Sequence, residues 1–361
     1  MAIVNFSDLL KHAGEHRYAI NIFPVGSLAE LNAIITAAHA QRASVILAPT
    51  PDSNDTAIAR ALFAACEVAA SDAAIPVALL GFQGGAAEAS AAYIKQGCGA
   101  LHITPDPAQF PEAVEQVKAL TELGKQCGIA MGAILLAPPV KTPTPGQDAK
   151  PAVAECIAFA QRSELEFLEV DWLAYNEAKK KRAKVDYDRL KRISEALGRV
   201  LLIRVDDDLV PEQIYRLIEY GVALVYHAPF LGCQDTQRLQ ERFKAWGSAG
   251  RAAEVLTHCQ PWQTTEHVIE FNVRQDALSE INKVLAEGRQ RLATIPGVRR
   301  VTTGKAIAAN ARYQFCWIIT FANEKVVEFY RNHPLHVEFA DRCFRPIADD
   351  RLTIDFQMTA P

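Results

Sequence analysis

Short apolar runs alternate with longer amphipathic segments over roughly the first two thirds of the chain. The runs are too short for helices, and several are apolar on both faces, as in parallel strands buried on both sides. The eight runs span residues 18–23, 43–48, 76–80, 100–103, 130–136, 168–171, 200–203 and 223–226. Segments between them carry apolar residues at helical spacing, for example 28–41 and 111–126. This repeat predicts a closed (β/α)8 TIM barrel. An open doubly wound sheet is the alternative, weakened because no Gly-x-Gly-x-x-Gly motif opens a helix.

The pattern changes near residue 245, where the run 246–250 combines tryptophan, glycine, serine and alanine. Beyond it the order becomes strand, helix, strand, strand, helix, strand, which is typical of a ferredoxin-like α+β domain. The supporting segments are 267–273, 277–292, 313–321, 325–331 and 352–356, with a turn at 295–298. We therefore predict a barrel over 1–246, a linker over 247–263 and a small domain over 264–361. The open face of such a sheet needs cover, which favours a homodimer or higher homo-oligomer.

Composition narrows the class of protein. Of the 361 residues, 50% are hydrophobic and 22% are charged, which is typical of a globular protein. The net charge of −4 argues against nucleic-acid and anionic-membrane partners. No apolar run reaches the ~18 residues of a membrane span, and the first residues lack a signal-peptide pattern. The eight cysteines form no Cys-x-x-Cys pair. Reduced thiols in a cytoplasmic protein are therefore expected, and no cofactor is predicted.

Three segments of the barrel carry a family resemblance: residues 18–23, residues 185–190 (Val-Asp-Tyr-Asp-Arg-Leu) and residues 219–222 (Glu-Tyr-Gly-Val). With them, residues 5–245 resemble the class II ketose-bisphosphate aldolase family. The resemblance implies a TIM barrel, a carbon–carbon lyase activity in carbohydrate metabolism and a zinc-bound enediolate. Family members carry an acid/base aspartate, three zinc-binding histidines and a glycine-rich phosphate loop.

This chain departs from those motifs. Phe82 stands at the position of the aspartate, and Gln83, Asn176 and Arg204 stand at the positions of the three histidines. Tyr226 replaces a further Asp or Asn. An arginine at a ligand position repels a metal ion, so the departures predict an aldolase-like protein without the usual zinc. A divalent metal relocated to His102, Glu169 and Asp171 stays open as an alternative.

Other polar residues lie at the C-terminal ends of the predicted strands. Glu169 and Asp171 are two residues apart on one strand, so both side chains point to the same side, where one acts as a base and the other orients it. Arg204 is then an anchor for an anionic substrate, with a structural Arg204–Asp171 ion pair as the alternative.

His102 and His227 are either a titrating pair or buried core histidines. A Schiff base on Lys141, in the proline-rich segment 138–146, is a further alternative. The predicted substrate contacts are Gln83, His102, Asn176, Arg204, Tyr226, His227 and His267.

The last domain contains a Tyr-x-x-His-Pro-x-His run at residues 330–336. With residues 266–271 and 355–356, it resembles the stress-responsive A/B barrel (Dabb) family, whose members form dimeric α+β barrels. Tyr330 and His336 match the catalytic pair of a plant cyclase of that family. The resemblance implies that His336 takes a proton next to a carbonyl while Tyr330 holds the enolate oxygen, with His267 and His333 nearby. The alternative is structural, with His333 capping a helix and His336 packed at a dimer interface.

Two functions follow. The first is a divergent aldolase-like lyase or cyclase that forms or cleaves a C–C bond next to a carbonyl in a small anionic substrate. The second is a catalytically degenerate barrel that binds a small anionic metabolite, with the Dabb-like domain as the dimerisation module.

Overall fold

The structure is a computed structural model, and it describes residues 3–50, 56–83, 86–105, 110–136, 151–172, 185–198, 200–205, 209–227 and 235–358. Two compact units can be distinguished. The first comprises Met1–Ser90, Cys98–Gly124 and Ile129–Pro261, and the second Ala91–Gly97, Lys125–Gly128 and Trp262–Pro361. Each unit is described by itself. No helix in the described ranges is long and apolar enough to cross a bilayer.

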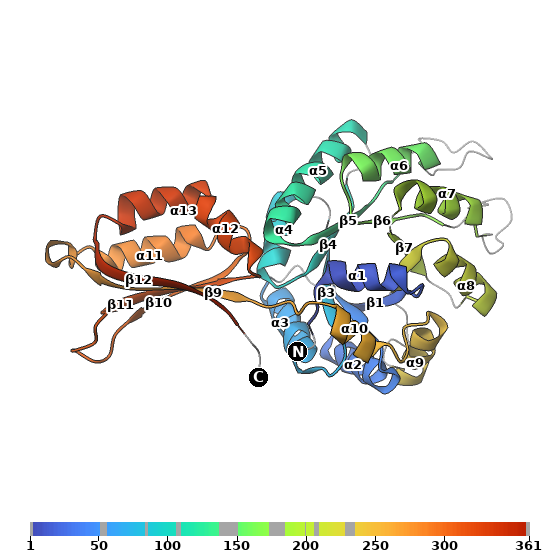
Figure 1. Ribbon diagram of the computed structural model, residues 1–361, viewed down its shortest axis with the longest axis horizontal. Helices are drawn as coiled ribbons and strands as arrows, with labels where there is room; N and C mark the ends of the chain where they lie inside the picture. Colours follow the sequence, from blue (N-terminus) through green and yellow to red (C-terminus); the bar gives the residue numbers. More distant parts are fainter. Residues whose placement is uncertain are drawn as a thin grey trace. The chain divides into compact units, whose positions relative to one another are not determined.

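Strands β1 to β8 form a closed parallel barrel, because each strand pairs with the next and β8 pairs with β1. Helices surround the ring (Figure 1). The predicted TIM barrel is thereby confirmed, and the open sheet is wrong. The strands are β1 Ile20–Val25, β2 Val45–Pro49, β3 Val77–Gln83, β4 Ala100–Ile103, β5 Ala130–Ile134, β6 Phe167–Glu169, β7 Val200–Val205 and β8 Val222–His227. The helices are α1 Phe6–Glu15, α2 Leu28–Gln41, α3 Thr56–Asp72, α4 Ala87–Lys95, α5 Phe110–Cys127, α6 Val153–Arg162, α7 Tyr187–Leu197, α8 Pro211–Glu219, α9 Thr236–Ala245 and α10 Ala252–His258.

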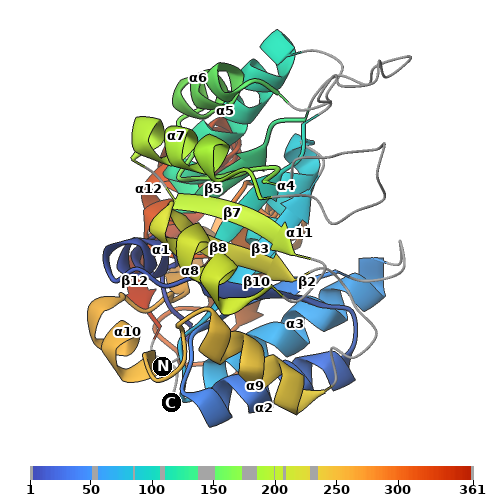
Figure 2. The same cartoon turned by 90° about the vertical axis from the view of Figure 1, so that its right-hand side faces the viewer.

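The strands are apolar on both faces because one face fills the barrel and the other packs against helices. Ile22, Leu80 and Leu224 belong to the interior core. Phe167 fills the space beside Gly132, whose Cβ, if present, would lie 2.1 Å from the Phe167 ring. On the outside, α2 and α9 lie side by side (Figure 2).

Helix α1 closes the N-terminal end of the barrel. It begins at Asn5, whose side chain accepts a hydrogen bond from the Asp8 amide. Phe6 contacts Phe167, the first residue of β6, with ring centroids 5.7 Å apart. Helix α10 packs against α1 and adds Val255 to the same core, although its residues lie in the segment 247–263 that the sequence analysis treats as a linker.

The second unit contains an antiparallel sheet in the order β10-β11-β9-β12. Its strands are β9 Thr265–Val273, β10 Val298–Lys305, β11 Phe315–Phe321 and β12 Ala348–Gln357. Helices α11 Ile281–Leu292, α12 Lys325–Asn332 and α13 Pro334–Phe339 cover one face of the sheet (Figure 1). Between sheet and helices, Trp317 contacts Phe339 and Phe344 edge to face. The predicted ferredoxin-like order is confirmed. The first helix begins later than position 277, because Gln275–Ala277 form a separate 3-10 turn.

Candidate functional site

Five side chains gather inside the barrel at the C-terminal ends of its strands, and we call them the mouth cluster: Phe82, His102, Glu169, Arg204 and Tyr226. Strand pairing places them in rows, since Phe82 is opposite His102 and Arg204 is opposite Tyr226. This end of a TIM barrel carries the active site in characterised enzymes.

A buried carboxylate lies at the centre of the mouth cluster. Glu169 accepts two hydrogen bonds from the Arg204 guanidinium, at 2.6 and 3.1 Å. Its Oε2 also lies 2.9 Å from His102 Nε2. Burial alone would raise the pKa of Glu169, but His102 and Arg204 outweigh it and lower that pKa from 4.5 to about 2. Glu169 is therefore an anion at neutral pH and orients both of its partners.

The Arg204 guanidinium lies between two aromatic rings. Its central carbon is 5.1 Å from the Phe82 centroid and 4.7 Å from the Tyr226 centroid. The rings and Glu169 restrict the guanidinium, yet 42% of the arginine side chain stays exposed. Burial raises the pKa of Tyr226, so its hydroxyl keeps its proton. The arrangement is a positioned cation at the barrel mouth, suited to a planar anion.

Residues next to the mouth cluster point the other way, because side chains alternate along a strand. Gln83 donates a hydrogen bond to Ser90 of α4, with a donor–acceptor distance of 2.5 Å. His227 lies 2.8 Å from the Asn21 oxygen, contacts Arg242 and stacks on Phe23. Burial, with Arg242 beside it, holds the pKa of His227 well below 6.5. His102 faces inward and His227 outward, so a titrating pair of the two is wrong.

Asp171 lies beyond the end of strand β6, outside the mouth cluster that contains Glu169. Strand β6 ends at Glu169, and the Asp171 side chain is exposed. The carboxylate that clamps Arg204 belongs to Glu169 rather than to Asp171. Within the described ranges, the metal-type ligands that come within 4.8 Å of one another are those of His12, His16 and Glu254. The three residues His102, Glu169 and Asp171 do not form such a group, and a relocated metal on them stays an untested prediction.

The mouth cluster also does not fit the family's zinc. Phe82 offers no donor atom, and the Glu169 carboxylate already binds a guanidinium, whose charge repels a cation. Asn176 and Lys141, named by the sequence analysis, lie outside the described residues.

A second polar cluster lies between the sheet and helices of the C-terminal unit. The Tyr330 ring is 4.3 Å from the His336 ring and 6.0 Å from the His267 ring. His267 Nδ1 is 2.6 Å from Asp355, which also pairs with Arg331. The expected convergence of Tyr330, His336 and His267 is therefore present, whereas His333 caps α13 by accepting a hydrogen bond from the Leu335 amide.

The protonation states of this pair follow from its contacts. His336 Nδ1 lies 3.0 Å from the Arg331 carbonyl oxygen, so Nδ1 carries the proton and Nε2 keeps its lone pair. Burial lowers the pKa of His336 and raises that of Tyr330. Near pH 7 the pair thus offers a neutral imidazole beside a protonated phenol.

The sequence analysis missed the cluster of His12, His16 and Glu254. The signal was present in the spacing, because His12 and His16, like Glu254 and His258, are four residues apart and so share one helix face.

A closed parallel barrel with a polar C-terminal mouth, followed in the chain by an α+β sheet, defines a TIM-barrel protein with a second domain. The family model of class II fructose-bisphosphate aldolase matches residues 4–227, and this chain belongs to that family. The model of the stress responsive A/B barrel domain matches residues 265–358. No curated protein matches the chain.

Solved structures support the barrel fold. The YdjI aldolase from Escherichia coli K12 has 20% identity and a TM-score of 0.57, covering 69% of this chain and 99% of that one. A putative fructose-1,6-biphosphate aldolase from Coccidioides immitis gives the same identity and TM-score, covering 69% and 98%. Fructose-bisphosphate aldolase from Campylobacter jejuni has 10% identity and a TM-score of 0.55, covering 69% and 96%.

Proposed function

We propose that this family member is a carbon–carbon lyase or cyclase that acts next to the carbonyl of a small anionic substrate, without the family's zinc. Family membership supports the reaction class. The observation that carries the rest is the Arg204 guanidinium, fixed by Glu169 and two aromatic rings where the family resemblance places a zinc ligand.

Arg204 has the donors for a carboxylate or phosphate. A guanidinium has five N–H groups in a planar fork, and Glu169 accepts from Nε and one terminal nitrogen. The pre-formed clamp lowers the entropic cost of binding, because the arginine side chain is already ordered. The Tyr226 hydroxyl, which stays protonated, is a donor for the substrate carbonyl.

The C-terminal domain offers an alternative site of its own, and we propose that its Tyr330–His336 pair transfers a proton on a substrate bound within that domain. A retro-aldol or ring-closing step needs a base and a donor to the developing enolate oxygen. His336 Nε2 has the lone pair, and Tyr330 has the proton. Within the mouth cluster, Glu169 is a weak base because its pKa is low.

Turnover of hydroxy-carbonyl compounds in the retro-aldol direction, and ring closure of polyketone acids, tests the proposal. If the barrel mouth carries the reaction, Arg204→Ala should raise KM at least tenfold. If the C-terminal pair carries it, His336→Gln and Tyr330→Phe should each lower kcat ~100-fold, and Arg204→Ala should change neither constant. Arg192→Ala, an exposed arginine paired with Asp188, is the matched control. Turnover should persist in EDTA while the fold, followed by circular dichroism, is intact. Complete loss of turnover under that condition would refute the metal-independent reaction.

The second candidate is a barrel that binds an anionic metabolite without converting it. It is favoured by the lack, among the described mouth residues, of an exposed general base. Calorimetric binding of a carboxylate or phosphate that depends on Arg204, with no turnover in any assay, would select this function.

We further propose that the C-terminal sheet mediates homodimerisation. Leu352, Ile354 and Phe356 of β12 alternate onto one face, and each side chain is at least 40% exposed. Val268 and Ile318 extend this apolar row across β9 and β11. An apolar face of this kind is typical of a homodimer interface.

A further inference from the structure

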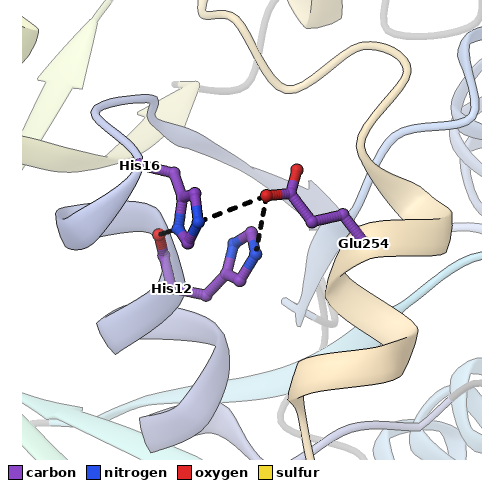
Figure 3. Close-up of side chains that lie close together, drawn as sticks. All are labelled: His12, His16 and Glu254. Atoms are coloured by element: carbon purple, nitrogen blue, oxygen red, sulfur yellow. Dashed lines mark hydrogen bonds and ion pairs between the residues drawn. The ribbon is translucent and has the colours of Figure 1, made fainter.

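A cluster of metal-type ligands joins two helices at the N-terminal end of the barrel. His12 lies in the last turn of α1, and His16 is the residue that ends that helix. Glu254 projects toward both imidazoles from α10 (Figure 3). This end of the barrel is opposite the mouth cluster, so the proposed reaction does not use it.

The spacing of the ligand atoms matches a tetrahedral metal site. Glu254 Oε1 lies 3.6 Å from His12 Nε2 and 3.2 Å from His16 Nε2. Zinc bonds of about 2.0–2.1 Å at tetrahedral angles place neighbouring ligand atoms about 3.3 Å apart. All three ligand atoms lie within 4.8 Å of one another. The two imidazole rings stack with their centroids 4.0 Å apart, so one ring must turn about its side-chain bonds before both Nε2 atoms point at one ion.

Both imidazoles have Nε2 near Glu254 and use Nδ1 for another contact. His16 Nδ1 lies 2.9 Å from the His12 carbonyl oxygen, which fixes its proton on Nδ1 and leaves the Nε2 lone pair facing Glu254. His12 Nδ1 lies 3.1 Å from the Tyr18 hydroxyl. A ligating histidine usually makes such a contact through its other ring nitrogen, which sets the tautomer.

The buried nitrogen of His12 points to a missing ligand. The residue is 3% exposed, and Nε2 has no hydrogen-bond partner among the residues that the structure describes. An unsatisfied buried nitrogen costs about 1–3 kcal/mol, which a bound cation would remove. The other oxygen of Glu254 pairs with Arg251 at 3.2 Å, so the carboxylate has one oxygen for a metal.

We propose that His12, His16 and Glu254 bind a divalent transition-metal ion of the zinc type, with solvent in the fourth position. The ion crosslinks α1 to α10, the helix that follows the barrel. Two imidazoles and a carboxylate suit zinc better than magnesium or calcium, which prefer oxygen ligands. The ion stabilises the cap over the N-terminal end of the barrel, because it links two helices of that cap.

The test uses the full chain, stripped with EDTA and dialysed. Calorimetric titration with ZnCl2 should give one strong site per chain, and CoCl2 should give the visible bands of tetrahedral Co²⁺ without a thiolate charge-transfer band. Glu254→Gln and His16→Ala should each weaken binding ~100-fold. Tyr18→Phe, which removes the hydroxyl that contacts His12 Nδ1, should weaken it about tenfold. His39→Ala, a histidine of α2 outside the cluster, is the control and should bind as wild type does.

Unfolding temperature is the second readout. Zinc should raise the melting temperature of the wild type and of His39→Ala, and should raise that of His16→Ala by less at the same zinc concentration. His16 and Glu254 are each more than a third exposed, so their variants should fold, which far-ultraviolet circular dichroism checks. Equal zinc affinity in wild type and Glu254→Gln, or no strong site in the wild type, would overturn the proposal. Neither result bears on the proposed function, because that proposal is tested with turnover assays on variants of Arg204, Tyr330 and His336.

Discussion

The Glu169 carboxylate should make the stability of the barrel depend on pH. Its pKa is lowered from 4.5 to about 2 in the folded protein. A lowered carboxyl pKa stabilises the fold fully above the unfolded value and loses this contribution as the pH falls toward the folded value. The shift of the Glu169 pKa corresponds to about 3 kcal/mol at pH 7. By pH 3, about 2 kcal/mol of it is lost.

Glu169→Gln removes the charge and keeps an acceptor for Arg204. We expect the variant to be about 2–3 kcal/mol less stable than wild type at pH 7. At pH 3 the difference should shrink below about 1 kcal/mol, because wild type has then lost most of the contribution. Urea unfolding at pH 7 and pH 3 measures the difference in the free energy of unfolding between wild type and Glu169→Gln. Trp172, which donates to the Arg204 carbonyl oxygen at 2.8 Å, provides fluorescence close to the site.

Glu195→Gln is the matched control. Glu195 is exposed and pairs with Lys191 four residues earlier at 3.9 Å, so its loss should cost under about 0.5 kcal/mol at either pH. A Glu169→Gln difference that stays the same from pH 7 to pH 3 would show that the Glu169 carboxyl is not the titrating group, and the electrostatic reasoning would be wrong.

Three further predictions concern other parts of the molecule. Gly132→Ala should destabilise the barrel by about 1–3 kcal/mol in urea unfolding, because the new methyl group would overlap the Phe167 ring. Phe356→Glu should convert the proposed dimer to a monomer in sedimentation velocity, whereas an unchanged sedimentation coefficient would exclude this face as the interface. Because burial lowers the pKa of His336, kcat/KM should fall only below about pH 6.5 and be level above it; a midpoint above that value would contradict the base assigned.

The fold was predictable because alternation and burial leave a strong local signal. The strands of the barrel are continuous apolar runs, so their number and order could be read from the sequence. Helices α1 and α10 were not predicted. Helix α10 is short and follows a glycine-containing segment that resembles a linker, and only its contacts with α1 reveal that it completes the core.

The mouth cluster was less predictable, because it depends on which way each side chain points and on where each strand ends. The sequence analysis treated Phe82 and Gln83, and also Tyr226 and His227, as facing one site. Neighbours on a strand face opposite ways, so only Phe82 and Tyr226 enter the barrel. Pairing Arg204 with Glu169 rather than Asp171 required knowing where β6 ends, which a short apolar run does not fix.

Arg204 stands where the family resemblance places a metal ligand, and under the proposed function this determines what the barrel mouth can stabilise. A guanidinium holds an anion through directed N–H groups, but it does not lower the pKa of a bound water as a dication does. The mouth should therefore discriminate by substrate charge. A carboxylated ketone should bind about 10–100-fold more tightly than its neutral amide, since charge-assisted hydrogen bonds contribute about 1.5–3 kcal/mol. Calorimetry with such a matched pair measures this ratio, and the preference should disappear in Arg204→Ala. Equal affinity for acid and amide in wild type would mean that the guanidinium serves only to neutralise Glu169.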